Sequence, residues 1–226
     1  MRKISDAVSR QVHSSLEPYV ALRDGYMNMS AYAQTIRDDI EDRTSKEVHS
    51  GSIVVTLARL RKKLRQEHPL LPELHMQDIS ARSNLVEMTF DRTDATLRCL
   101  KDLYRNLPTH ASDFLAVTQG ARELCIVTSE AGMQTLQKHF AGQKPKLHLR
   151  NLAALTMSFD GKHIQTPNML FAILRMLVIP RINVVEIIST YSEVTFIVDA
   201  SDLEEAFSIF SSILYTNRSS PQSRSV

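Results

Sequence analysis

Apolar and polar positions in the C-terminal third of the chain follow the periods of strands and helices. The run 182–198 contains two apolar, β-branched-rich segments around a polar patch, which is typical of a β-hairpin. The segment 166–178 begins with Thr-Pro and continues in good helix formers, and 201–214 repeats apolar residues on one face. With a strand expected at 155–159, the predicted order is strand, helix, strand, strand, helix.

The same order occurs earlier in the chain. Residues 117–140 align without a gap on residues 187–210, an offset of 70 positions, and apolar positions coincide across strand, turn and helix. Such self-similarity indicates a duplicated unit. We therefore predict an α+β protein in which two ferredoxin-like βαββαβ modules occupy 81–150 and 151–215, each with an antiparallel sheet that carries both helices on one face.

The N-terminal third has helical periodicity. Helices are expected at 5–22, where Pro18 would kink or break the pattern, at 31–43, and from Ser50 or Ser52 onward. The apolar stripe of the last helix consists of Ile53, Leu57, Leu60 and Leu64. Its outward face consists of Ser52, Val55, Arg59, Lys62 and Lys63. This pattern predicts an all-α, helix-turn-helix-like domain at 1–68 whose third helix contacts DNA, although a solvated basic face on a small bundle explains the same residues.

Polar and proline-broken segments separate these parts. Residues 69–80 are expected to form a linker. The alternating segment 80–91 is read as a strand, and its first half is alternatively a wing strand of the N-terminal domain. Residues 216–226 are polar and are expected to form a disordered tail.

Composition narrows the class of protein. The formal net charge of the 226 residues is +2, from 27 basic and 25 acidic side chains, so nucleic-acid contact would have to come from local clustering. Two cysteines, Cys99 and Cys125, form no disulfide framework. There is no apolar run long enough to span a membrane and no signal-peptide pattern, so we expect a cytoplasmic protein without membrane contact.

Motifs for catalysis are absent from the sequence. It contains no glycine-rich phosphate loop, no Gly-X-Ser-X-Gly and none of the standard zinc spacings, and its eight histidines are scattered. We therefore expect no enzyme activity, no catalytic residues, no metal site and no cofactor.

The second module resembles the ACT domain of aspartokinases. The resemblance rests on the strand at 152–159, the Thr-Pro helix start at 166–168, the Arg-Ile-Asn-Val strand from 181, and the strand and acidic helix start at 194–207. Through the repeat it extends more weakly to the first module. The family has glycine where this chain has Asn168 and Arg181.

The resemblance implies a site for an allosteric amino acid such as lysine or threonine. Carried onto this chain, the site residues are Thr166, Pro167, Asn168 and Met169 in the loop, and Asn183 and Val184 on the second strand. The N–H groups at the start of the expected helix would favour a carboxylate, and an asparagine side chain can hold an amino or carboxyl group. Alternatively, Thr166 only caps the helix and Asn183 only supports a strand turn.

These observations lead to one main functional hypothesis and two alternatives. The main hypothesis is an amino-acid-responsive transcriptional regulator that binds DNA through its helical domain and forms a homodimer through its ACT sheets. The first alternative is an allosteric or scaffold subunit that binds an enzyme of amino-acid metabolism and no DNA. In the second alternative, the ACT pair binds no ligand and is purely architectural.

Overall fold

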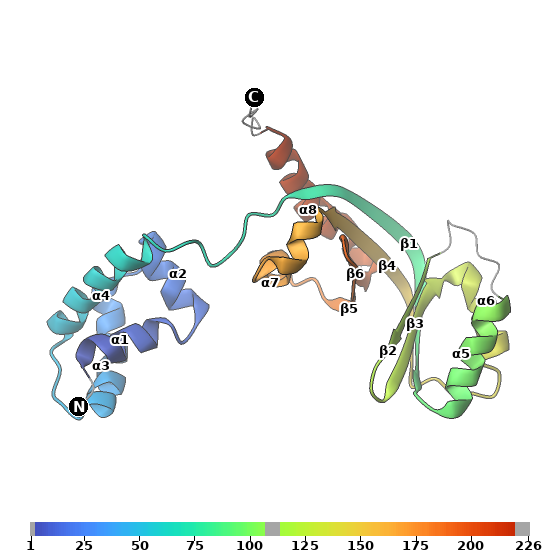
Figure 1. The fold of residues 1–226 in the computed structure, drawn as a ribbon, viewed down its shortest axis with the longest axis horizontal. Helices are drawn as coiled ribbons and strands as arrows, with labels where there is room; N and C mark the ends of the chain where they lie inside the picture. Colours follow the sequence, from blue (N-terminus) through green and yellow to red (C-terminus); the bar gives the residue numbers. More distant parts are fainter. Residues whose placement is uncertain (1–2, 107–113, 220–226) are drawn as a thin grey trace. The chain divides into compact units, whose positions relative to one another are not determined.

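The computed structural model describes residues 3–106 and 114–219. The chain separates into two compact units, Met1–Leu70 and Leu71–Val226 (Figure 1). Within the described ranges, no helix has both the length and the apolar character needed to cross a membrane.

The described part of the first unit consists of four helices where three were expected. They are α1 (Ile4–Val12), α2 (Leu16–Asp24), α3 (Met29–Thr44) and α4 (Ser50–Leu64). The expected first helix is thus divided at residues 13–15. Pro18 lies in the first turn of α2, where its missing N–H breaks no helical hydrogen bond, whereas a continuous helix would need that N–H.

Burial of α4 follows its apolar stripe. Ile53, Leu57 and Leu64 are fully buried against the other three helices, and Leu60 is partly buried. The guanidinium of Arg61 lies against Gly25, which ends α2 in a left-handed conformation (φ +94°) that favours glycine. Arg61 therefore faces the unit itself rather than the exposed side of α4.

The second unit is built on one antiparallel sheet of six strands in the order β2-β3-β1-β4-β6-β5. The strands are β1 (Met76–Asp91), β2 (Leu115–Gln119), β3 (Glu123–Ser129), β4 (Leu147–Phe159), β5 (Val184–Ser189) and β6 (Glu193–Asp199). The helices are α5 (Asp94–Asn106), α6 (Glu130–His139), α7 (Met169–Leu174) and α8 (Leu203–Ser219), with short 3-10 helices at Gly161–Gln165, Arg175–Leu177 and Ala200–Asp202.

The duplicated unit of the sequence is present in the structure. In each copy a hairpin is closed by the same backbone hydrogen bond, from Gly120 N–H to the Glu123 carbonyl (2.8 Å) and from Thr190 N–H to the Glu193 carbonyl (2.9 Å). Strands β3 and β6 begin at Glu123 and Glu193, and the two copies keep the offset of 70 positions. In each copy two helices pack on one face of its part of the sheet, α5 and α6 in the first and α7 and α8 in the second.

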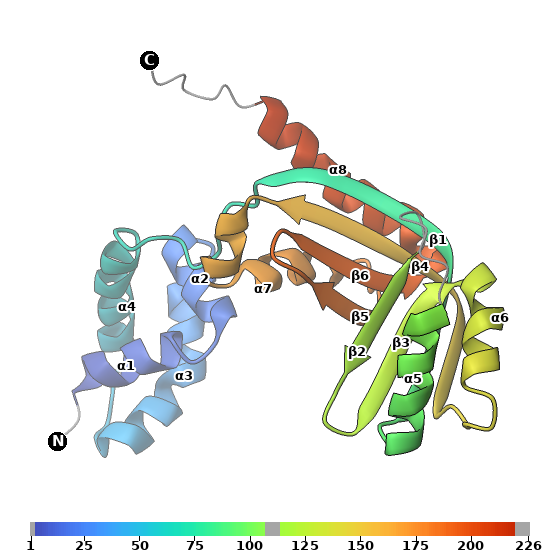
Figure 2. The ribbon, with the colours of Figure 1, turned by 45° about the vertical axis from the view of Figure 1, so that its right-hand side comes forward.

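The two modules share their two longest strands. Residues 85–91 of β1 pair with β3 as the first strand of the first module, whereas residues 76–82 pair with the second half of β4. Conversely, β4 pairs with β6 through residues 152–158 and closes the first module with its earlier residues. In Figures 1 and 2 both strands run from the α5–α6 end of the sheet to the α8 end.

Each shared strand has an irregularity where it passes from one module to the other. The pairing register of β1 and β4 shifts between residues 82 and 85 and again between residues 85 and 87 of β1. At these points Asn84 and Asn151 have the same positive φ, 58°. Asparagine tolerates the left-handed conformation better than other residues with a Cβ, and a bulge bends a strand. The two asparagines therefore mark the bend between the modules.

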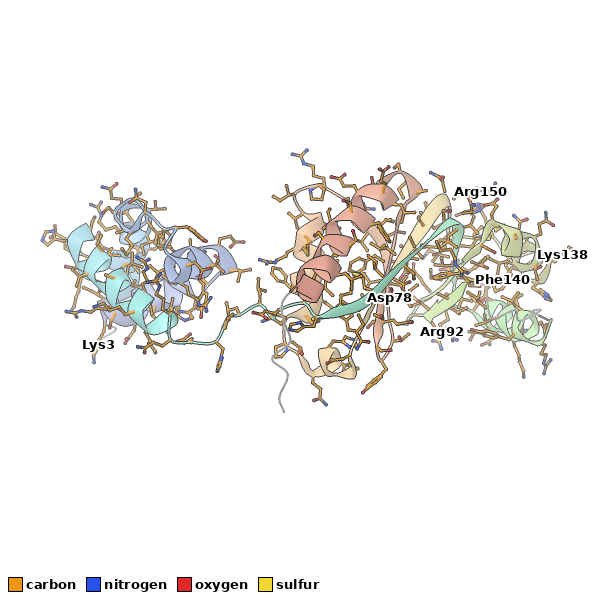
Figure 3. The ribbon with its side chains drawn as sticks, turned by 90° about the horizontal axis from the view of Figure 1, so that it is seen from above. Lys3, Asp78, Arg92, Lys138, Phe140 and Arg150 are labelled. Carbon is orange, nitrogen blue, oxygen red and sulfur yellow. The ribbon has the colours of Figure 1, made fainter. Side chains whose placement is uncertain are left out.

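The described part of the second unit contains three apolar clusters. The outer faces of the two modules pack against their helices, around Phe90 and Phe140 in the first and Phe196 and Phe210 in the second. In Figure 3, Phe140 is labelled among the side chains at the α5–α6 end of the sheet. A third cluster on the helix-free face joins residues of β3 and β6, which are not neighbours in the sheet, and side chains of both edge strands pack on it. The helix-free face is thus folded onto itself.

The shared strands change the module boundaries expected from the sequence. Strand β1 begins at Met76, so residues 76–80 of the expected linker belong to the sheet, and they complete the second module. The expected boundary between 150 and 151 lies inside β4, because one continuous strand serves both modules. Helix α8 continues to Ser219, into the segment expected as a tail, and residues 220–226 lie outside the described residues.

The bend provides a test of the shared-strand fold. Asn84 is exposed and has positive φ, so Asn84→Val should lower the free energy of unfolding by about 1–3 kcal/mol, because a β-branched residue is strained there. Asn84→Gly should change it by less than about 1 kcal/mol. Urea denaturation of the full chain measures both. Ser80→Val, at an exposed β1 position without positive φ, is the control and should be near neutral. Equal losses from the two valine variants would contradict this account of the bend.

Candidate ligand site beside helix α7

The loop between β4 and α7 starts its helix later than the sequence suggests. The expected helix has Thr166 as its cap and Pro167 as its first residue, but α7 begins at Met169. Residues 161–165 form a 3-10 helix instead, and Asn168 occupies the N-cap position with φ 62° and no side-chain capping bond. A left-handed residue cannot continue a right-handed helix, so the turn at Asn168 sets the start of α7.

The loop is held against the β5–β6 turn. The backbone N–H of Phe159 donates to the carbonyl of Ser192 (2.8 Å), and the Tyr191 ring lies so close to Gly161 that a Cβ there would collide with it. His163 is buried, its Nδ1 lies 2.9 Å from the Asp160 carbonyl, and its ring packs on Phe159 with centroids 5.5 Å apart. These contacts position the loop beside the end of β5.

A cavity of about 270 Å³ lies at this junction. Its lining comes from the loop, from the first residues of α7 and from β5 and β6: His163, Ile164, Thr166, Asn168, Met169, Leu170, Phe171, Ser189 and Val194. A neighbouring hollow of about 260 Å³ shares three of these residues, His163, Thr166 and Met169. Its other lining residues are Glu73, His75, Phe159 and Asp160.

The lining combines a few polar groups with apolar walls. Thr166 and Ser189 offer hydroxyls, Asn168 an amide that both donates and accepts, and His163 an imidazole. Met169 and Val194 are buried and form the apolar floor, whereas Leu170 and Phe171 are about half exposed at the rim. Small-molecule sites have this composition, with apolar walls and a small number of orienting polar groups.

The structure brings together three of the six residues expected from the resemblance. Thr166, Asn168 and Met169 line the cavity, and Pro167 is an exposed residue between them. Asn183, also exposed, and Val184, which begins β5, line neither hollow. The second-strand contribution to the cavity comes from the opposite end of β5, at Ser189.

The two residues that replace family glycines keep a glycine-like backbone. Asn168 has φ 62° and Arg181 has φ 60°, both in the left-handed region. Residues with a Cβ occupy this region at an energetic cost, and it is the usual reason for glycine at such a position. The loop geometry is therefore retained although the residue types differ.

Sequence reasoning missed part of the lining. His163 and Ser189 have no motif around them, and they meet only because the 3-10 helix turns the loop toward the β5–β6 hairpin. One signal was present: Ser189 begins the polar patch of the hairpin that the pattern predicted. Polar residues at the end of an expected strand, next to a turn, are natural candidates for a site that loops help to form.

Comparison with known proteins supports the fold. No protein-family model matches the sequence, and no curated protein matches it. Among solved structures, the ligand-free regulatory subunit of aspartate kinase from Thermus thermophilus is similar with a TM-score of 0.51 and 10% identity, over 62% of this chain and 99% of that one. The aspartate kinase of Clostridium acetobutylicum matches with a TM-score of 0.51 and 14% identity, over 65% of this chain and 36% of the kinase. Aspartokinase alpha and beta subunits match with a TM-score of 0.50, 11% identity and coverages of 62% and 99%.

The second unit has an ACT-like fold. These likenesses are to regulatory subunits, or to about a third of a whole kinase, and at such low identity they concern the arrangement of strands and helices. The second unit, with its repeated hairpins and paired helices, is the part of this chain that has the expected ACT arrangement. The first unit consists of helices.

Proposed function

We propose that this protein is a regulatory protein that binds a free amino acid in the cavity beside α7. The observation that carries the proposal is the convergence of Thr166, Asn168 and Met169 on one cavity, in an ACT-type fold that keeps the left-handed turns at Asn168 and Arg181. These residues were selected from a resemblance in sequence, and the cavity is an independent geometric feature.

The size and polarity of the cavity suit this ligand class. Its volume of about 270 Å³ is below the range of roughly 300–1,000 Å³ typical of drug-sized ligands. An amino acid needs donors for its carboxylate and acceptors for its ammonium, and the hydroxyls of Thr166 and Ser189 and the amide of Asn168 can serve as both. The apolar floor at Met169 would contact the side chain of the ligand.

Regulation would follow from the position of the cavity between separate elements. The walls come from the loop before α7 and from the ends of β5 and β6. A ligand that contacts both the loop and the strand ends binds more tightly to conformations in which these elements are close. This difference in affinity is what would shift the conformational equilibrium of the protein.

A thermal-shift screen of the full chain with the twenty proteinogenic amino acids tests the proposal. We expect one or a few chemically related amino acids to raise the Tm, because a ligand that binds only the folded state stabilises it. Thr166→Val and Ser189→Ala, which remove hydroxyls from the lining, should weaken the binding of that amino acid about tenfold or more, measured by calorimetry.

Thr118→Val is the matched control, since Thr118 is exposed on β2 and belongs to neither hollow. It should leave the affinity unchanged. If no amino acid raises the Tm and calorimetry detects no heat of binding, the purely architectural alternative is favoured and the proposal fails.

We also propose that two chains form a homodimer through the ACT sheets. Strands β2 and β5 are the edges of the sheet, and β5 exposes 40% of Ile187 at its centre. An edge strand with an exposed apolar side chain is prone to pair with another strand, and a two-fold axis would bring two copies of β5 together. Pairing there would place Asn183 and Val184 near the partner, where they could complete the ligand site.

Light scattering after size-exclusion chromatography tests the dimer. The full chain should have a molar mass of about 51 kDa, twice its 25.6 kDa. Ile187→Lys should give the monomer mass, because like charges opposite each other on paired strands are destabilising. Thr118→Lys on the other edge should remain dimeric, and a wild-type monomer would contradict the proposal.

DNA binding by the first unit is a second candidate function. The observation that favours it is that Ser52, Val55, Arg59, Lys62 and Lys63 are all exposed on α4, whereas Ile53 and Leu57 on its other side are fully buried. Such a face can place cations on phosphates and a few other side chains at base edges. The rival for this surface is a protein partner, in particular an enzyme of amino-acid metabolism.

An electrophoretic shift assay with genomic DNA fragments separates these two functions. If α4 contacts DNA, replacing Lys62 and Lys63 together by alanine should weaken binding to all fragments and reduce the slope of log affinity against log salt by about 2. Lys46→Ala, an exposed lysine of the same unit outside α4, should have little effect. Absence of a shift, or an unchanged salt slope in the double variant, would contradict DNA binding through α4. The basic face would then contact a protein partner or only solvent.

A further inference from the structure

Three potential metal ligands meet in the interior of the second unit, outside the cavity beside α7. They are Glu87 on β1, Cys125 on β3 and Glu186 on β5, and their ligand atoms all lie within 4.8 Å of one another. In the sheet, β3 and β5 are separated by β1, β4 and β6, which in a flat sheet would correspond to roughly 19 Å. The three residues meet because the bend at Asn84 and Asn151 folds the helix-free face onto itself.

Glu87 is poorly satisfied in this interior. Its exposed fraction is 3%, and its Oε2 is buried without a hydrogen-bond partner. Its Oε1 accepts one bond, from the Thr89 hydroxyl at 3.2 Å. A buried carboxylate without full hydrogen bonding is destabilising unless a proton or a cation compensates it. The Glu87 carboxylate that carries this unpartnered oxygen belongs to the same cluster as the Cys125 thiol and the Glu186 carboxylate.

Burial and neighbouring acidic groups dominate the electrostatics of this cluster. Burial raises the pKa of the Glu87 carboxyl, and the charge of Glu186 raises it further, whereas the hydrogen bond from Thr89 lowers it. Burial also raises the pKa of the Cys125 thiol, as do the neighbouring Glu87 and Glu186. No lysine or arginine in the described part of the chain forms an ion pair with either carboxylate.

We propose that Glu87, Cys125 and Glu186 bind a divalent metal ion of the zinc class between the two modules. One sulfur and two carboxylate oxygens match the ligand types of Zn²⁺, which takes sulfur at about 2.3 Å and oxygen at about 2.0–2.2 Å, usually in tetrahedral geometry. Ligand atoms in such a tetrahedron are roughly 3.3–3.7 Å apart. Side-chain rotations that move the ligand atoms by about an ångström would therefore bring the three residues to coordination distance of one ion. The sulfur favours zinc-class metals over Mg²⁺ or Ca²⁺.

The ion would supply what the cluster lacks. Its two positive charges offset the buried carboxylates, and a coordinated thiol loses its proton to the metal's field despite the anionic surroundings. Glu186 is half-buried on an edge strand, which leaves a route from solvent to the cluster. Coordination would join β5 of the second module to β1 and β3 of the first, and it would hold the bent sheet closed.

The proposal departs from the sequence-based expectation of no metal site. Zinc motifs are recognised by ligands at short, regular spacings, and these three residues are separated by 38 positions (87 to 125) and 61 positions (125 to 186). No short motif can reveal a site whose ligands come from three strands of a folded sheet.

Titration of the metal-free full chain with Co²⁺, a spectroscopic substitute for Zn²⁺, tests the proposal. We expect a sulfur-to-cobalt charge-transfer band and the visible bands of tetrahedral Co²⁺, saturating at a single ion per chain and bleached by Zn²⁺. Cys125→Ser should abolish the charge-transfer band. Cys99→Ser is the matched control, because Cys99 is a half-buried free thiol on α5 outside the cluster, and it should keep the full spectrum.

A second variant guards against misfolding of the buried serine variant. Glu186→Gln changes a half-buried side chain on an edge strand, and it should lower Co²⁺ affinity at least about tenfold while the circular dichroism spectrum stays that of the parent chain. Zn²⁺ should raise the Tm of the parent and raise it less in Glu186→Gln. A parent chain without the charge-transfer band, or a band lost in Cys99→Ser and kept in Cys125→Ser, would overturn the proposal.

Discussion

The second unit depends on two strands that each belong to two modules. Strands β1 and β4 pair with each other along most of their length, and each changes its outer partner part-way. A flat ribbon of this length would leave the helix-free face open to water. The left-handed backbone at Asn84 and Asn151 bends both strands at nearly the same level, so the two halves of the sheet can pack face to face.

Face-to-face packing determines which side chains of the edge strand β5 are inside. Glu186 reaches the interior cluster with Glu87 and Cys125, whereas Ser189 lines the cavity beside α7. One short strand therefore contacts both candidate sites, and its register shift between Val184 and Glu186 fixes which residues face inward. A change in the position of β5 would alter both the metal cluster and the cavity beside α7. Binding of the proposed metal ion and binding of the proposed amino acid would therefore be coupled through this strand.

The sequence was sufficient to predict the duplicated unit but not to predict that the two modules share β1 and β4. Strands β3 and β6 with their hairpins were predictable because their apolar residues are continuous and the copies align without a gap. The start of β1, at residues 76–79, was not predictable. Met76 and Ile79 are the only residues of this strand before Leu85 that are at least partly buried, and their spacing of three does not match the period of two of a half-buried strand. The pairing of β1 with β4 also joins residues that are 58 positions apart at one end (Thr89 with Leu147) and 83 at the other (Met76 with Phe159), and no local pattern specifies such contacts.

The candidate ligand site shows the same division between local and non-local information. Thr166, Asn168 and Met169 were selected from the resemblance in sequence, and they belong to one short loop. The predicted start of the helix was wrong, because Asn168 turns the chain before α7. The replaced glycines clarify what that position requires. A glycine would permit φ near 60° and leave open space, whereas asparagine permits the same φ and adds an amide to the cavity wall. Asn168 therefore preserves the backbone that a glycine would have and alters the chemistry of the cavity wall, so the proposed ligand would meet an amide that a glycine does not offer.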